Sequence, residues 1–158
     1  LHDRPVSRDE VLASGVVEPE LWTQIEETAL ALFQRGQSVV AEQGLILVDT
    51  KYEFGVLDDE LILIDEVHTP DSSRYWHSDD YQKRFDAGQD PRSLSKEFIR
   101  KALAANGYTG DGEPPVLEDD LRVEAAQRYM ELYEFITGET FEGATGDPNV
   151  RIKAALKL

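Results

Sequence analysis

Two neighbouring segments of the chain interrupt apolar runs with charged side chains. In residues 45–55, Asp49, Lys51 and Glu53 occupy alternate positions after an apolar start. In the next segment an apolar run ends at Asp65, and hydroxyl, acidic and cationic residues follow. Carboxylate oxygens suit Mg²⁺, which proteins usually hold through one or two carboxylates together with substrate phosphates. The pattern indicates the rim of an active site, carried by the two strands of one hairpin.

The register of this hairpin decides which charged side chains meet. A three-residue loop places Glu53 opposite Asp65, whereas a two-residue loop places Tyr52 there. Adjacent carboxylates repel unless a cation lies between them or one is protonated. We expect the three-residue register, with Leu57 opposite Leu61 and a divalent cation bridging the two acids or lying beside them.

Lys51 is expected on the same strand face as Glu53, because side chains alternate along a strand. Nucleotide sites place a carboxylate-bound metal ion and a cationic side chain around the oxygens of the phosphoryl group that is transferred. Solvated strand charges joined in an ordinary ion pair are the other interpretation. The residue types alone leave the two interpretations equally weighted.

The stretch 69–74 combines turn-forming, hydroxyl and cationic residues. It is either a capped turn with Arg74 at the surface or an anion cradle, in which hydroxyl and N–H groups supplement a guanidinium that binds phosphate or carboxylate. Its short distance in sequence from Asp65 favours the cradle. Arg100 lies on a later expected helix, where a cation is more often solvated than bound to a ligand.

The composition narrows the possible partners. Among 158 residues, 32 are acidic and 16 are Lys or Arg, so the formal net charge is −16. This charge argues against binding to nucleic acid or an anionic membrane, and it requires local cations around any anionic ligand. The absence of cysteine excludes disulfides and thiolate chemistry. We expect a cytoplasmic protein without metal-binding histidines and, because the chain begins with Leu1, part of a longer protein.

The apolar spacing predicts an α+β fold with one antiparallel sheet, whose catalytic hairpin has helices on its other face. A turn-rich segment, 1–18, precedes an amphipathic helix with Pro19 in its first turn, and Gly44 is expected to end that helix in a left-handed conformation. An irregular stretch is expected from Trp76 to Pro91. The remaining expected elements are strands 45–54 and 61–67, helices from 93 or 95 to 105 and 118–136, and a short helix after 148.

Three sequence motifs resemble those of the SAICAR synthetase (phosphoribosylaminoimidazole-succinocarboxamide synthase) family. LILVDTKYEFG at 45–55 and DEVHTPDSSRYW at 65–76 are similar to the two family signatures, and KEFIR at 96–100 is similar to a later substrate-binding helix. The resemblance implies an ATP-dependent ligase of de novo purine synthesis. It would join L-aspartate to the carboxylate of the imidazole nucleotide CAIR through an acyl phosphate, giving SAICAR, ADP and phosphate.

The resemblance also implies residue roles. Glu53 and Asp65 resemble the ligands of Mg²⁺ and ATP, and Lys51 the residue beside the transferred phosphoryl group, with Asp49 supporting Lys51 or the aspartate substrate. Arg74 and Arg100 would receive substrate phosphate or carboxylate groups. The residues expected to shape the CAIR pocket are Asp71, Ser72 and Ser73.

On the same resemblance, residues 1–158 form the C-terminal nucleotide- and metal-binding lobe of a fold related to ATP-grasp enzymes and kinases. An N-terminal lobe with a glycine-rich ATP loop would lie outside this chain, and an oligomer is possible. Two other interpretations stay open. One is a different ATP-grasp or kinase-like phosphotransferase, and the other is a non-catalytic acidic interaction domain.

Overall fold

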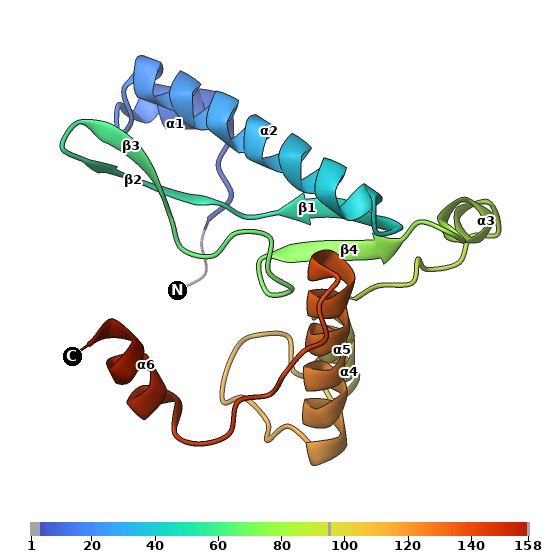
Figure 1. Cartoon of the computed structure of the whole chain (residues 1–158). Helices are drawn as coiled ribbons and strands as arrows, with labels where there is room; N and C mark the ends of the chain where they lie inside the picture. The colour runs from blue at the N-terminus through green and yellow to red at the C-terminus, as the bar shows by residue number, and fades with distance from the viewer. Residues whose placement is uncertain (1–3, 95, 158) are drawn as a thin grey trace.

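The structure is a computed structural model that describes residues 4–94 and 96–157. It combines helices with two small antiparallel sheets (Figure 1), which confirms the expected α+β class. No helix within the described residues is long and apolar enough to cross a membrane. The elements are α1 (Arg8–Ser14), α2 (Pro19–Ala41), β1 (Leu45–Thr50), β2 (Glu53–Leu57), β3 (Glu60–Ile64), β4 (Ser73–His77), α3 (Tyr81–Asp86), α4 (Glu97–Ala105), α5 (Asp119–Thr137) and α6 (Pro148–Leu156).

Helix α2 is the scaffold on which both sheets rest. Pro19 occupies its first turn, where the missing N–H group costs no hydrogen bond, and Gly44 follows the helix with a φ of 72°, as expected. The helix runs alongside β1 and reaches β3 (Figure 1). The buried core is formed by Val40, Leu45, Leu47, Tyr75, Leu94 and Leu132.

The strands pair differently from the single hairpin that the sequence predicted. The expected strand 45–54 is interrupted at Lys51 and Tyr52, so β1 pairs with β4 while β2 pairs with β3. Residues 92–94 extend the first sheet on the other side of β4, where the N–H of Leu94 donates to the Tyr75 carbonyl at 3.1 Å. Strand β4 therefore lies in the middle of the sheet that carries the core.

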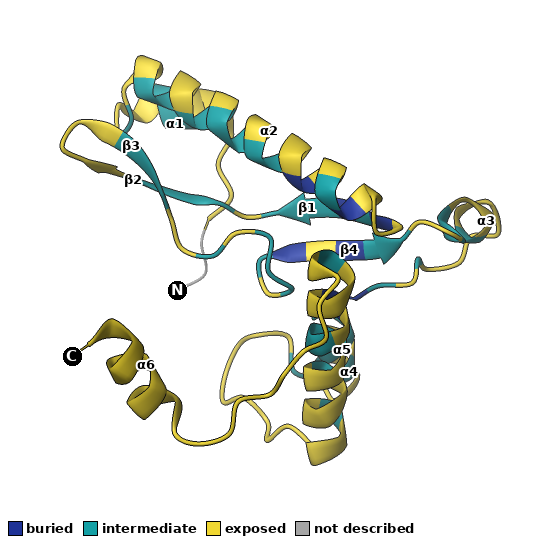
Figure 2. Cartoon of the chain, in the orientation of Figure 1, coloured by how far each residue is buried: buried dark blue, intermediate teal, exposed yellow. Residues whose placement is uncertain are grey.

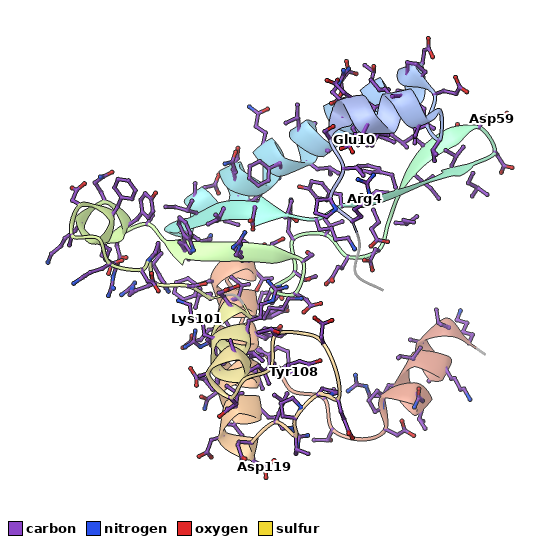
Figure 3. All side chains as sticks on the ribbon, turned by 180° about the vertical axis from the view of Figure 1, so that it is seen from behind. Arg4, Glu10, Asp59, Lys101, Tyr108 and Asp119 are labelled. Atoms are coloured by element: carbon purple, nitrogen blue, oxygen red, sulfur yellow. The ribbon has the colours of Figure 1, made fainter. Side chains whose placement is uncertain are left out.

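The turn between β2 and β3 has two central residues, so the predicted three-residue register is wrong. Leu57 pairs with Glu60, and Glu53 pairs with Ile64 instead of Asp65. The central residues Asp58 and Asp59 have φ values of 51° and 64°. A two-residue hairpin turn with positive φ at both positions matches the twist of the flanking strands, and aspartate tolerates that conformation. Asp59 lies at the outer end of this hairpin (Figure 3).

A β-bulge at Val48 changes the face on which Asp49 lies. Leu47 pairs with Tyr75, but the register then shifts by one residue and Asp49 pairs with Arg74. Paired residues share a face, and Tyr75 is buried while its neighbour Arg74 is exposed. Without the bulge, Asp49 would continue the buried face of Leu47. Asp49 therefore lies on the strand face opposite to that of Leu47.

The helices were predicted with mixed success. α4, α5 and α6 lie where the sequence placed them, but α1 occupies a segment expected to be turns, and β4 and α3 extend into the stretch expected to be irregular. α1 begins with a capping box in which Ser7 and Glu10 satisfy each other's backbone N–H groups. α6 is exposed throughout its length (Figure 2).

Candidate functional site

A cavity of about 210 Å³ opens where the end of β1, the start of β4 and the N-terminal turn of α4 converge. It gathers seven of the nine residues predicted for the site, and it lies apart from the other two, Glu53 and Asp65. The lining residues are Asp49, Thr50, Lys51, Asp71, Ser72, Ser73, Arg74, Lys96, Glu97 and Arg100.

Arg74 and Asp49 face each other across the two paired strands. The Nε of Arg74 donates to both carboxylate oxygens of Asp49 at 2.9 Å, and a second guanidinium nitrogen also contacts that carboxylate. These hydrogen bonds hold the pKa of Asp49 below its ordinary value and raise the pKa of Arg74. Both side chains stay about half exposed, so the guanidinium is charged, oriented and open to the cavity.

Lys51 lies in the link between β1 and β2. Its ammonium group forms an ion pair with Glu53, two residues later, and its backbone N–H donates to the Ser72 carbonyl at 3.1 Å. The backbone bond fixes Lys51 beside the turn that begins β4. Asp49 therefore contacts Arg74, whereas the carboxylate partner of Lys51 is Glu53.

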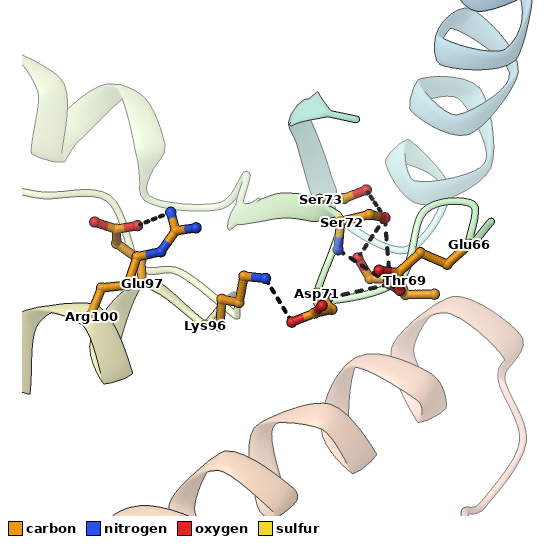
Figure 4. Close-up of polar contacts among 8 residues, drawn as sticks. All are labelled: Glu66, Thr69, Asp71, Ser72, Ser73, Lys96, Glu97 and Arg100. Carbon is orange, nitrogen blue, oxygen red and sulfur yellow. Dashed lines mark hydrogen bonds and ion pairs between the residues drawn. The ribbon is translucent and has the colours of Figure 1, made fainter. Parts of the chain in front are cut away.

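The turn before β4 is organised by hydroxyl groups (Figure 4). The Oγ1 of Thr69 accepts from the N–H groups of Asp71 and Ser72 at 3.3 Å, and its own hydroxyl donates to Glu66. The buried hydroxyl of Ser73 donates to Thr50 on β1 at 2.8 Å. The segment is thus a capped turn, as one interpretation of its sequence predicted, and it also forms one wall of the cavity; its action as an anion cradle stays a prediction.

Helix α4 supplies the opposite wall (Figure 4). Lys96 Nζ donates to Asp71 Oδ1 at 2.7 Å, and Arg100 Nη1 lies 3.6 Å from Glu97 Oε2. Lys96 and Arg100 are four residues apart, which places them on one side of a helix. The predicted site omitted Lys96, Glu97 and Thr50, although the KEFIR motif contains the first two.

Four of the chain's 16 Lys and Arg residues line this one cavity. In a chain with a net charge of −16, such clustering supplies four cationic hydrogen-bond donors to an anionic ligand at one place. Each cation is paired with a carboxylate. The pairs are Lys51–Glu53, Arg74–Asp49, Lys96–Asp71 and Arg100–Glu97.

The expected metal ligands are not assembled in the same way. Asp65 follows β3 with a φ of 65°, and its side chain is exposed, while Glu53 is engaged with Lys51. Residues 4–94 and 96–157 contain no group of three or more His, Cys, Asp or Glu residues that could hold a metal ion. Two hard carboxylates suit Mg²⁺ when phosphate oxygens supply further ligands. Glu53 and Asp65 fit that chemistry as donors, but not a protein-only metal site.

Comparison with known proteins agrees with the motifs around this cavity. The sequence profile described as SAICAR synthetase matches residues 1–115, most of the chain. The chain belongs to the SAICAR synthetase family. The phosphoribosylaminoimidazole-succinocarboxamide synthase of Bacteroides thetaiotaomicron is 50% identical over 143 residues, which cover 89% of this chain and 46% of that protein. The corresponding enzyme of Legionella pneumophila (strain Paris) is 47% identical over 157 residues, which cover 96% of this chain and 50% of that protein.

Solved structures of SAICAR synthetases share this fold. The SAICAR synthase of Saccharomyces cerevisiae, in complex with SAICAR, superposes with a TM-score of 0.68 at 33% identity and covers 84% of this chain and 44% of its own. A SAICAR synthetase in complex with ADP superposes with a TM-score of 0.63 at 29% identity, and the match covers 90% of this chain and 48% of that one. The chain thus spans about half the length of these family members.

Proposed function

We propose that this chain is the C-terminal, substrate-binding part of an ATP-dependent ligase that joins L-aspartate to CAIR. The observation that carries this proposal is the convergence of four cations and a hydroxyl-lined turn in one cavity, all from the segments that resemble family motifs. CAIR brings a phosphate and a carboxylate, and aspartate brings two carboxylates. Family membership does not favour a non-catalytic acidic domain or a different phosphotransferase.

The reaction begins with transfer of the γ-phosphoryl group of ATP to the CAIR carboxylate, which releases ADP. The aspartate amine then attacks the acyl phosphate, an amide bond forms, and phosphate leaves with the bonding electron pair. Lys51 is placed to stabilise charge on the transferred phosphoryl oxygens, because a preorganised cation lowers the energy of such a transition state. The aspartate ammonium loses one proton before attack and one on amide formation, and it keeps the third as the amide N–H, so the net products are SAICAR, ADP, phosphate and protons.

Arg74, Arg100 and Lys96 are suited to bind the anionic groups of CAIR and aspartate. A guanidinium can bind a carboxylate or phosphate through two hydrogen bonds, which fixes its orientation as well as its position. Asp71 and the hydroxyls of Ser72 and Ser73 then shape the CAIR side of the cavity. Asp49 holds Arg74 in the observed orientation.

Glu53 and Asp65 are proposed to hold Mg²⁺ together with nucleotide phosphates. When bound, the ion would neutralise part of the phosphate charge. Since the two acids are not opposite each other in the hairpin, nucleotide oxygens must complete the coordination. A site of this kind would not require a third protein ligand from the described residues.

The remaining part of the nucleotide site is proposed to come from an N-terminal lobe with a glycine-rich loop, as in ATP-grasp- and kinase-related folds. The exposed apolar side chains of the β2–β3 hairpin support this proposal. Val56 and Leu57 are 54% and 60% exposed in the isolated chain. Apolar residues clustered on a strand pair are typical of surfaces that are covered in the whole protein.

The function is tested with the full-length enzyme by following ADP release and SAICAR formation. We expect release of ADP to require CAIR, and formation of SAICAR to require aspartate as well. Equal ADP release with unrelated carboxylates or hydroxyl compounds in place of CAIR would favour a different phosphotransferase. Absence of turnover together with no thermal stabilisation by magnesium nucleotide and CAIR would refute the ligase assignment.

A further inference from the structure

His68 lies in the connection between β3 and β4 and is held from several directions. Its Nε2 and the hydroxyl of Tyr52 share a hydrogen bond of 2.5 Å, and its carbonyl accepts a hydrogen bond from the hydroxyl of Tyr75. Its ring lies against α2 at Gly36, where an added Cβ would come within 2.8 Å of Nδ1. Helix, strand and link residues therefore all contact this one residue.

The backbone of His68 has a φ of 56°, in the left-handed region. That conformation is uncommon for residues other than glycine, and it persists where the surroundings determine it. Burial raises the pKa of Tyr75 to about 12, so its hydroxyl remains a donor to the His68 carbonyl at neutral pH. The connection before Thr69 thus has one conformation imposed by its contacts.

The Tyr52–His68 hydrogen bond connects two segments that border the cavity. Tyr52 lies between Lys51 and Glu53 in the link from β1 to β2, and His68 directly precedes Thr69, which organises the turn of the cavity. The two sheets share no strand, because β1 pairs with β4 and β2 pairs with β3. The side-chain hydrogen bond therefore joins the links that run between the two sheets.

We propose that His68 and Tyr52 are positioning residues that hold the Thr69–Arg74 turn in place relative to Lys51. Neither side chain lines the cavity, so they act through the cavity residues next to them in the chain. This inference rests on the proposed function, since it concerns the alignment of CAIR with the transferred phosphoryl group. Misplacement of a reacting group by about 1 Å can lower a rate by about 100-fold.

Ordinary core packing would make the ring contacts important and the hydrogen bond dispensable. The two possibilities separate in Tyr52→Phe, which keeps the aromatic ring beside His68, at a centroid distance of 5.5 Å, and removes only the hydroxyl. His68→Leu removes the hydrogen bond from the other side. His68→Gln provides a rescue variant, because its amide group can occupy the place of Nε2 and bond the tyrosine.

The kinetic test uses the full-length enzyme with these three variants and the double variant. We expect Tyr52→Phe and His68→Leu to lower kcat/KM for CAIR about 10-fold to 100-fold, while KM for ATP changes less than about twofold. The double variant should have a kcat/KM for CAIR no lower than that of the less active single variant, since both substitutions remove the same hydrogen bond. His68→Gln should recover most of the activity. Tyr133→Phe, which removes an exposed hydroxyl bonded to Glu139, is the matched control.

A second measurement does not depend on the reaction. The N–H groups of Asp71 and Ser72 are held by Thr69, so their hydrogen exchange reports the order of the turn. We expect faster exchange at both positions in Tyr52→Phe and unchanged exchange in Tyr133→Phe. Unaltered kinetics, with or without faster exchange, would overturn the proposal, and so would slower turnover with unaltered exchange. An inactive wild-type enzyme would refute the proposed function instead, and exchange would still test the contact.

Discussion

The substrate side and the metal side of the proposed site differ in how far this chain assembles them. On the substrate side, Asp49 and Arg74 lie 25 residues apart in sequence and meet as cross-strand neighbours at the cavity. On the metal side, Glu53 and Asp65 belong to one short hairpin and do not pair. Long-range strand pairing builds the first side, while a two-residue turn separates the acids of the second. Nearness in sequence is therefore a poor guide to which charges act together.

Lys51 lies between the two sides, so its replacement should have the largest effect. We expect Lys51→Met in the full-length enzyme to lower kcat about 100- to 1000-fold, because removing one preorganised group that stabilises developing charge costs that much. Steady-state turnover is the measurement. Lys101→Met is the control, since Lys101 forms an exposed ion pair with Asp90 outside the cavity. Equal losses in both variants would remove Lys51 from the reaction.

Arg74 tests the substrate side alone. We expect Arg74→Ala to raise KM for CAIR about 10- to 100-fold with little change for ATP, because a hydrogen bond to a charged group contributes about 1.5–3 kcal/mol. Arg74→Lys should recover only part of the affinity, since an ammonium cannot form the two parallel bonds of a guanidinium. A larger rise in KM for ATP than for CAIR would contradict the assignment.

The acids of the hairpin test the metal side. We expect Glu53→Gln or Asp65→Asn to raise the magnesium concentration needed for half-maximal turnover about tenfold, with near-normal KM for CAIR at saturating magnesium. Asp59→Asn serves as the control, because asparagine also tolerates the positive φ of that turn position. Near-normal turnover of both acid variants at ordinary magnesium would refute the metal assignment.

The smallest effect is expected in the pH dependence of stability. Burial lowers the pKa of His68 below 6.5, so the folded protein favours the neutral ring. The corresponding stabilisation is present above pH 6.5 and is lost as the pH falls through the folded-state pKa, because the unfolded chain binds the proton more readily. Urea unfolding of the full-length enzyme between pH 7.5 and about 5 should show a shallower decline in His68→Gln. His77, whose pKa burial also lowers, is unchanged in both proteins and so leaves the comparison intact.

The residues of the cavity could largely be predicted from the sequence because they lie in short motifs, whereas the contacts between those motifs could not. The hydroxyl residues of 69–74 form the capped turn that their side-chain chemistry suggested, and the binding of an anion by Arg74 stays a prediction. Lys96 lies outside the predicted site although the KEFIR motif contains it, because a cation on a helix is more often solvated and the motif does not show that this side chain contacts Asp71. Such a contact depends on packing between distant segments.

The strand pairing could not be predicted for a different physical reason. Residues 58–60 are all acidic, so both loop lengths were compatible with the sequence, and the choice depends on whether Asp58 and Asp59 adopt positive φ. The three-residue register needs a cation to offset the repulsion between Glu53 and Asp65, whereas the two-residue turn needs none and matches the twist of the flanking strands. The preference for the shorter turn prevailed. The helix at Arg8–Ser14 does have a sequence signal, because Ser7 and Glu10 have the spacing of a capping box.

The bulge at Val48 has a consequence for how this strand can evolve. In the part of β1 before the bulge, every second side chain points toward α2. The extra residue shifts this alternation, so the side chain of Asp49 lies on the same face as that of Arg74. The two halves of β1 can therefore accept substitutions independently, the first under the demands of packing and the second under those of ligand chemistry. Deletion of the Val48 codon would make Leu47 and Asp49 neighbours and restore regular pairing, so Asp49 would still lie opposite Arg74 and only the bulge would be lost.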